Sequence, residues 1–181
     1  MERNLTMIAL FAALIAALGL VPKFTLAFGV PISAQTLGVM LCGTILGARI
    51  GALAVLLFLA LVALGLPLLA GGRGGLGVFA GPTVGFIVGF PFAAFVTGWI
   101  MGQWRNAPIG LIAGVASIVG GVLVLYVFGA VGMMVTLNKT AAEAALLVTT
   151  FIPGDLIKAV LCGFITAGLA KARPASLLSR A

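Results

Sequence analysis

The chain has 181 residues, of which 63% are hydrophobic and only 7% are charged. A soluble domain carries about 25% charged residues, so this composition excludes a soluble globular domain and a disordered chain. The net charge of +7 does not indicate nucleic-acid binding, because the basic residues stand singly at the ends of apolar runs.

Long apolar runs predict an all-α membrane protein that forms a single domain over residues 1–181. Single charges separate the runs and mark where the chain leaves the hydrocarbon, since a spanning helix needs roughly 20 apolar residues. The intervals predict a bundle of six transmembrane helices, near residues 5–21, 32–48, 50–66, 82–102, 108–134 and 153–171.

Loop signals support these boundaries. Between the third and fourth predicted helices, Pro67 begins a long glycine-rich loop that contains Gly71-Gly72-Arg73-Gly74-Gly75 and closes at Gly81-Pro82. Residues 47–51 form a tight link between the second and third helices. Thr140 and Glu143 have the spacing of a capping box, which predicts a short, non-spanning helix over 141–150.

The basic residues predict the orientation of the bundle. With six crossings both termini share one side, which then holds Arg3, Arg49, Arg105, Lys171, Arg173 and Arg180, whereas the other side holds Lys23, Arg73 and Lys139. Because cytoplasmic loops carry the excess of Lys and Arg, we expect both termini in the cytoplasm. The glycine-rich loop then lies at the outer face.

Polar residues from separate parts of the chain also fall at this outer face. They are Ser33, Gln35 and Thr36 at the start of the second helix, Arg73 in the glycine-rich loop, and Asp155 and Lys158 near the start of the sixth. Asp155 and Lys158 are three residues apart, so they share a helix face. Ionisable residues within a span are costly and usually face the bundle interior, so we expect one substrate pocket here. The alternative is a structural ion pair that closes the helix end.

Further residues are candidates for the same pocket. Gly74 and Gly75 flank Arg73 and let the backbone approach a ligand and donate N–H groups. Arg73 has the alternative of an ordinary solvated loop residue, and Gln35 that of a helix-start amide without a ligand. Tyr126, the sole tyrosine, lies within the fifth helix, where its hydroxyl either reaches the cavity or simply packs.

The residue inventory limits the chemistry. The chain has no histidine and no phosphate-binding G-x-x-x-x-G-K-[ST] motif, so we expect no metal, no cofactor, no catalysis and no ATP binding by that route. Two or three cations and one anion suit a ligand that bears a carboxylate and a polar N–H head. Apolar and aromatic walls suit a hydrophobic middle.

The first helix carries small residues at helical spacing. Ala9, Ala13 and Ala17 are four residues apart and form a smooth ridge that lets another helix approach closely. We interpret this ridge as a partner-docking surface. The alternatives are packing within this protein and a chance result of abundant alanine.

Four motifs together resemble the BioY family, the biotin-specific substrate-binding (S) components of energy-coupling factor (ECF) transporters. They are Val30-Pro-Ile-Ser-Ala-Gln-Thr-Leu-Gly-Val39, Gly71-Gly72-Arg73-Gly74-Gly75-Leu76-Gly77, Gly81-Pro82-Thr83 and Pro153-Gly154-Asp155-Leu156-Ile157-Lys158. Their order and spacing cover most of the chain, and the combination is more specific than any one of them.

The resemblance implies a multi-pass protein of the prokaryotic cell membrane that binds biotin near the outer surface, beneath the loop between helices three and four. It implies that Asp155 and Lys158 contact biotin, with help from the Arg73 loop and the start of the second helix. It also implies that the first helix docks on a transmembrane coupling subunit that carries two ATP-binding subunits.

Two other functions remain as alternatives. A proton-coupled secondary transporter of a small carboxylate vitamin would need Asp155 as its proton site, because no other acid lies near a span. An S component for a different vitamin would share the fold and the partners but not the ligand.

Overall fold

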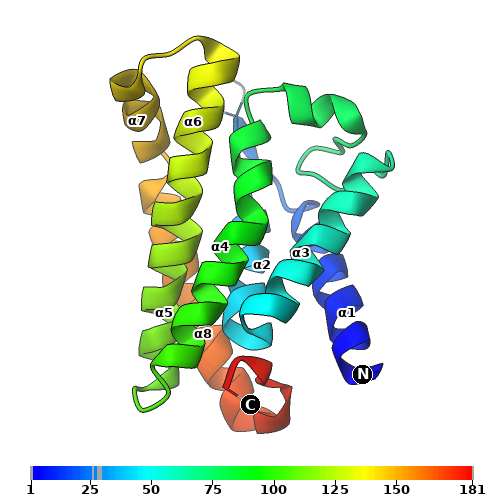
Figure 1. Cartoon of the computed structure of the whole chain (residues 1–181), viewed down its shortest axis with the longest axis vertical. Helices are drawn as coiled ribbons and strands as arrows, with labels where there is room; N and C mark the ends of the chain where they lie inside the picture. The colour runs from blue at the N-terminus through cyan, green and yellow to red at the C-terminus, as the bar shows by residue number, and fades with distance from the viewer. Residues whose placement is uncertain (1, 26, 28–29, 181) are drawn as a thin grey trace.

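The computed structural model describes residues 2–25, 27 and 30–180, and these are mostly helical (Figure 1). The α-helices are α1 (Glu2–Leu18), α2 (Gln35–Leu41), α3 (Ala48–Ala63), α4 (Val84–Gln103), α5 (Ile109–Ile118), α6 (Leu125–Leu137), α7 (Ala141–Thr149) and α8 (Ile152–Ala172). Two short strands, β1 (Phe24–Thr25) and β2 (Pro31–Ile32), pair antiparallel.

Two helices contain π-helical segments. The segment Cys42–Leu46 continues α2, and the segment Val119–Val124 joins α5 to α6 into one helix that runs from Ile109 to Leu137. Within the described part of the chain, three helices can cross a membrane by length and composition, namely Val84–Gln103, Ile109–Leu137 and Ile152–Ala172, whereas Gln35–Leu46 and Ala48–Ala63 are shorter apolar helices.

The helices lie within a few residues of their predicted positions, with four corrections. The first predicted helix ends at Leu18 rather than at residue 21, and the third ends at Ala63 rather than at residue 66. The second does not begin at residue 32, because Pro31–Ile32 pair with β1 and the helix starts only at Gln35. The predicted link at residues 47–51 is a single residue, since Gly47 has φ +83° and α3 begins directly after it.

Several helices meet without side chains between them. A Cβ at Gly85 would overlap the backbone of α6 at Phe128, and a Cβ at Gly98 would overlap the backbone at Gly47 and Ala48. Glycine at such positions lets membrane helices approach to backbone contact. This packing places α4 against both α3 and α6, near the centre of the bundle (Figure 1).

Both chain ends lie at the same end of the bundle (Figure 1). There the segment after α8 folds back on the helices. The Ser179 hydroxyl donates to the carbonyl of Thr44 at 2.5 Å, and the Arg180 guanidinium donates to the carbonyls of Trp104, Arg105 and Ala107. The capping box at Thr140 and Glu143 is confirmed at the start of α7, near the opposite end.

Candidate binding site

A cavity opens at the end of the bundle away from the two chain ends, and its empty volume is about 540 Å³ including the mouth. The polar lining residues are Ser33, Gln35, Thr36, Arg73, Thr83, Asp155 and Lys158, and the apolar ones are Val30, Ile32, Leu69, Ala70, Phe86, Ile87, Phe90, Leu125 and Phe151.

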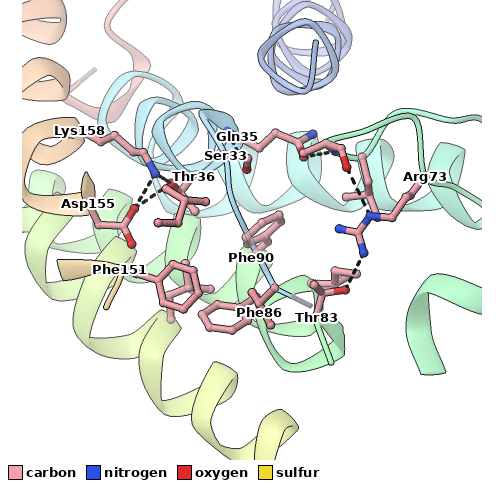
Figure 2. Close-up of a pocket in the computed structure, with 16 residues that line it drawn as sticks. Ser33, Gln35, Thr36, Arg73, Thr83, Phe86, Phe90, Phe151, Asp155 and Lys158 are labelled. Carbon is pink, nitrogen blue, oxygen red and sulfur yellow. Dashed lines mark hydrogen bonds and ion pairs between the residues drawn. The ribbon is translucent and has the colours of Figure 1, made fainter. Parts of the chain in front are cut away.

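Asp155 and Lys158 form a buried ion pair on one side of the cavity (Figure 2). Both stand in the first two turns of α8, where the acid also faces the positive end of the helix dipole. Lys158 Nζ lies 2.8 Å from Asp155 Oδ1 and 2.9 Å from the Thr36 hydroxyl, and that hydroxyl donates to Oδ1 at 3.1 Å. Thr36 therefore connects the pair on α8 to α2.

Tyr126 forms a further hydrogen bond with the ion pair. Its hydroxyl donates to Asp155 Oδ2 at 2.9 Å, although Tyr126 is not among the residues that line the cavity. With Thr36 and Lys158, this gives the carboxylate three donors, which satisfy a group whose side chain is only 5% exposed. The Lys158 side chain is 14% exposed, because its long stem brings the ammonium back toward the opening.

Arg73 lies on the other side of the cavity (Figure 2). Its Nε donates to the carbonyl of Ala70 at 3.3 Å, and its Nη1 donates to the Thr83 hydroxyl at 3.4 Å. Burial lowers the pKa of the guanidinium. None of the ion pairs among the described residues involves Arg73, so its charge is available to an anionic ligand.

The glycines beside Arg73 shape its loop and do not line the cavity. A Cβ at Gly74 would overlap the carbonyl of Leu66, and Gly75 has φ +79° while its N–H donates to the carbonyl of Val62 at 2.8 Å. Leu69 and Arg73 exchange two backbone hydrogen bonds across the turn. These contacts hold the Arg73 backbone in place.

Gln35 lines the cavity, but its amide serves the backbone. Its Nε2 donates to the carbonyls of Ile15 and Leu68 at 3.2 and 3.0 Å, and its Oε1 accepts from the N–H of Ala70 at 2.9 Å. The residue is 2% exposed. It therefore ties α1 and the segment that precedes Arg73 to the first turn of α2.

An aromatic wall lies between the two polar groups (Figure 2). Phe86 and Phe90 are one turn apart on α4, and the ring of Phe151, which directly precedes α8, lies 5.5 Å from that of Phe86. Sequence reasoning missed these three residues as well as Thr83 as lining residues. The available signals were the four-residue spacing and the position of Phe151 next to the Pro153–Lys158 motif.

The alanine ridge of α1 faces away from the bundle. Ala9, Ala13 and Ala17 are all exposed, whereas Ala12 and Ile15 on the same helix are buried. The ridge is thus open to a neighbour and is not used for packing among the described residues of this chain.

Comparison with known proteins agrees with these features. Residues 2–175 match the family model of the BioY family. The biotin transporter BioY of Rhodobacter capsulatus is 51% identical over an alignment of 189 positions, which covers 99% of this chain and 100% of the relative. The biotin transporter BioY of Rhizobium etli is 50% identical over 169 residues, or 90% of each chain.

A solved structure extends the likeness to three dimensions. The S-component for biotin from an ECF-type ABC transporter matches with a TM-score of 0.88 and 32% identity, over 94% of this chain and 92% of that one. The motifs, the fold and these relatives show that the chain belongs to the BioY family.

Proposed function

We propose that this protein is the biotin-binding S component of an ECF-type vitamin transporter, formed by one membrane domain. The observation that carries the proposal is the cavity with an ion pair at one side, phenylalanines in the middle and, at the other side, the Arg73 guanidinium, which forms no ion pair with the described residues. Relatives that match almost the whole chain are biotin transporters.

The charges favour one orientation of biotin. The pair of Asp155 and Lys158 is neutral as a unit, and its carboxylate would repel a second anion. The ureido ring, which offers two N–H donors and one acceptor, therefore suits this side. The valerate carboxylate suits Arg73, which can bind it through charge-assisted hydrogen bonds. The apolar middle of biotin would then lie along Phe86, Phe90 and Phe151.

The test is binding of labelled biotin by the purified protein. Arg73→Gln is expected to weaken biotin binding by at least about tenfold and to affect biotin amide, which lacks the carboxylate, much less. Arg105→Gln, which removes an exposed base at the far end, is the matched control. Wild-type affinity weaker than micromolar, or equal losses for biotin and biotin amide, would contradict the proposal.

The transport step is proposed to depend on partners. Positive-inside orientation puts both termini in the cytoplasm and the cavity at the outer face of the prokaryotic cell membrane, with six crossings. Ala9, Ala13 and Ala17 would dock on a transmembrane coupling subunit that carries two ATP-binding subunits. Ala13→Trp is expected to abolish ATP-driven uptake while biotin binding persists, and Val160→Trp on the exposed face of α8 is the control. Intact uptake in Ala13→Trp would contradict this docking surface.

The same assays separate the alternatives. A proton-coupled carrier would need Asp155 to exchange a proton, yet its carboxylate already accepts three hydrogen bonds. Uptake that persists without ATP-binding subunits and collapses with the proton gradient would favour that carrier. A panel of other vitamins tests the ligand, since tighter binding of another member would exclude biotin as the substrate.

A further inference from the structure

A second, larger hollow lies outside the site already described, between α3 and α4. It is a groove with about 1,320 Å³ of empty space including its open side, and every lining residue is apolar. Residues that shape it include Ala52, Leu56 and Ala60 of α3, Phe92 and Phe95 of α4, and Phe79 of the loop segment Leu76–Ala80. A wall without any polar side chain suits hydrocarbon and excludes a polar solute.

The groove exists because the two helices diverge. They touch where a Cβ at Gly98 would overlap the backbone of Gly47 and Ala48, at the end of the bundle that carries the chain termini. They separate toward the other end, where the segment with Phe79 connects them (Figure 1). The small side chains of Ala52 and Ala60 on α3 do not fill the space between the two helices, so the groove stays open.

A charge and an indole stand at the narrow end of the groove. Arg49 precedes Ala52 by three residues and Leu56 by seven, so it continues the groove-facing stripe of α3 by one turn. Arg49 is exposed, and none of the ion pairs among the described residues involves it. Trp99 follows Phe95 by one turn on α4 and is 55% exposed, as is usual for tryptophan at a membrane–water interface.

The length of the groove matches one leaflet of a bilayer. The stretch from Ala52 to Ala60 rises about 12 Å at 1.5 Å per residue. One leaflet contributes about 15 Å, half of the roughly 30 Å hydrocarbon core. An acyl chain that enters beside Arg49 would therefore fill the groove up to Phe79, and its phosphate would remain at the interface beside the guanidinium.

We propose that this groove binds one anionic phospholipid, with an acyl chain between α3 and α4 and the phosphate at Arg49. A short segment of chain connects this groove to the ligand cavity. Phe79 in the groove stands four residues before Thr83, whose hydroxyl accepts from Arg73 in the cavity. A seated acyl chain supports the segment that connects these residues.

The experiment measures phospholipid retained by the full-length protein after transfer from vesicles into detergent, by native mass spectrometry. Phosphatidylglycerol and phosphatidylcholine vesicles are compared. Wild type is expected to retain about one phosphatidylglycerol per chain. Arg49→Gln is expected to weaken phosphatidylglycerol binding about fivefold and phosphatidylcholine binding less, because the choline cation offsets the phosphate charge. Lys171→Gln, at an exposed base of the same end, is the matched control.

Filling the groove tests the acyl-chain part of the site. Ala60→Phe is expected to release both lipids, whereas Val160→Phe on the exposed face of α8 retains them. Unchanged thermal unfolding shows that the variants remain folded, and Ala52→Phe serves if Ala60→Phe does not fold. Retention of phosphatidylglycerol at wild-type levels in both groove and Arg49 variants overturns the proposal. If the wild type is a dimer in detergent and Ala60→Phe is a monomer that still retains lipid, the proposal is also overturned, because the occupant of the groove is then a second copy.

Discussion

The ion pair of Asp155 and Lys158 allows a double-mutant cycle that separates a structural role from a ligand-binding role. The variants are Asp155→Asn, Lys158→Met and their combination. Each single change removes one charge and leaves the other in a nearly dry site, with side-chain exposures of 5% for Asp155 and 14% for Lys158. The combination removes both charges and leaves neutral side chains of similar size.

The expected magnitudes follow from the contacts. Breaking a buried pair by removing one partner costs about 3–5 kcal/mol. Here the lower figure applies, because the Asp155 carboxylate keeps the Thr36 and Tyr126 hydroxyls when Lys158 is lost. Each single variant should therefore lose about 3 kcal/mol of unfolding free energy. The double variant should lose about 3 kcal/mol, about half of the sum, because no unpaired charge remains.

The assay combines denaturant unfolding in detergent with biotin binding for all four proteins. Stability should recover in the double variant relative to the sum of the singles, but biotin affinity should not recover. Additive stability losses would refute the reasoning about the buried pair. Wild-type biotin affinity in the double variant would show that the pair serves only the fold.

Three further changes test other contacts. Gln35→Leu leaves three backbone groups without their buried partner and should lower the unfolding free energy by about 3 kcal/mol in the same denaturant assay, so a neutral result would contradict its structural role. Thr140→Ala should cost α7 about 1 kcal/mol and speed its amide hydrogen exchange. Hydrogen bonds from Thr140 lower the pKa of Glu143 from its ordinary 4.5. The contribution of the capping box to α7 protection should therefore be complete above that pH and be lost as the pH falls through the lower folded-state pKa; a contribution that stays constant down to about pH 2 would exclude this linkage. Gly98→Ala should sharply reduce stability by separating α3 from α4. Gly168→Ala is the control and should be neutral or stabilising, because nothing lies within 4 Å of its Cβ. Equal melting temperatures for the two variants would argue against backbone contact at Gly98.

Much of the fold was predictable because charge is expensive in hydrocarbon. Isolated bases such as Arg49 and Arg105 stand within two residues of helix ends, so their spacing located the helices. The convergence of Arg73 with Asp155 at one cavity followed from the same counting. Helix starts were less certain, because an apolar residue such as Ile32 fits a strand as well as a helix.

The sequence indicated aromatic walls and two possible roles for Gln35, but it could not decide which phenylalanines form the wall or which role Gln35 has. Which face Phe86 presents depends on the rotation of α4, and that rotation is set by backbone contacts such as the one at Gly85. An amide at a helix start can serve a ligand or a carbonyl equally well, and only the position of Leu68 and Ala70 decides that it serves the backbone. The exposed face of the alanine ridge also depends on this packing.

The π-helical segment Val119–Val124 decides the direction in which Tyr126 points. Such a segment accommodates one extra residue in a helix, which turns everything beyond it by about 100° relative to an uninterrupted α-helix. A regular α-helix of unchanged length would therefore rotate the phenol off Asp155, whereas deleting one residue there would remove the extra residue and leave the phenol on the same side. A further insertion in this stretch is therefore far less neutral than its Val-Gly-Gly-Val-Leu-Val composition suggests. Substitution of Gly120 is not neutral either, because a Cβ there would overlap the backbone of α4 at Ala93.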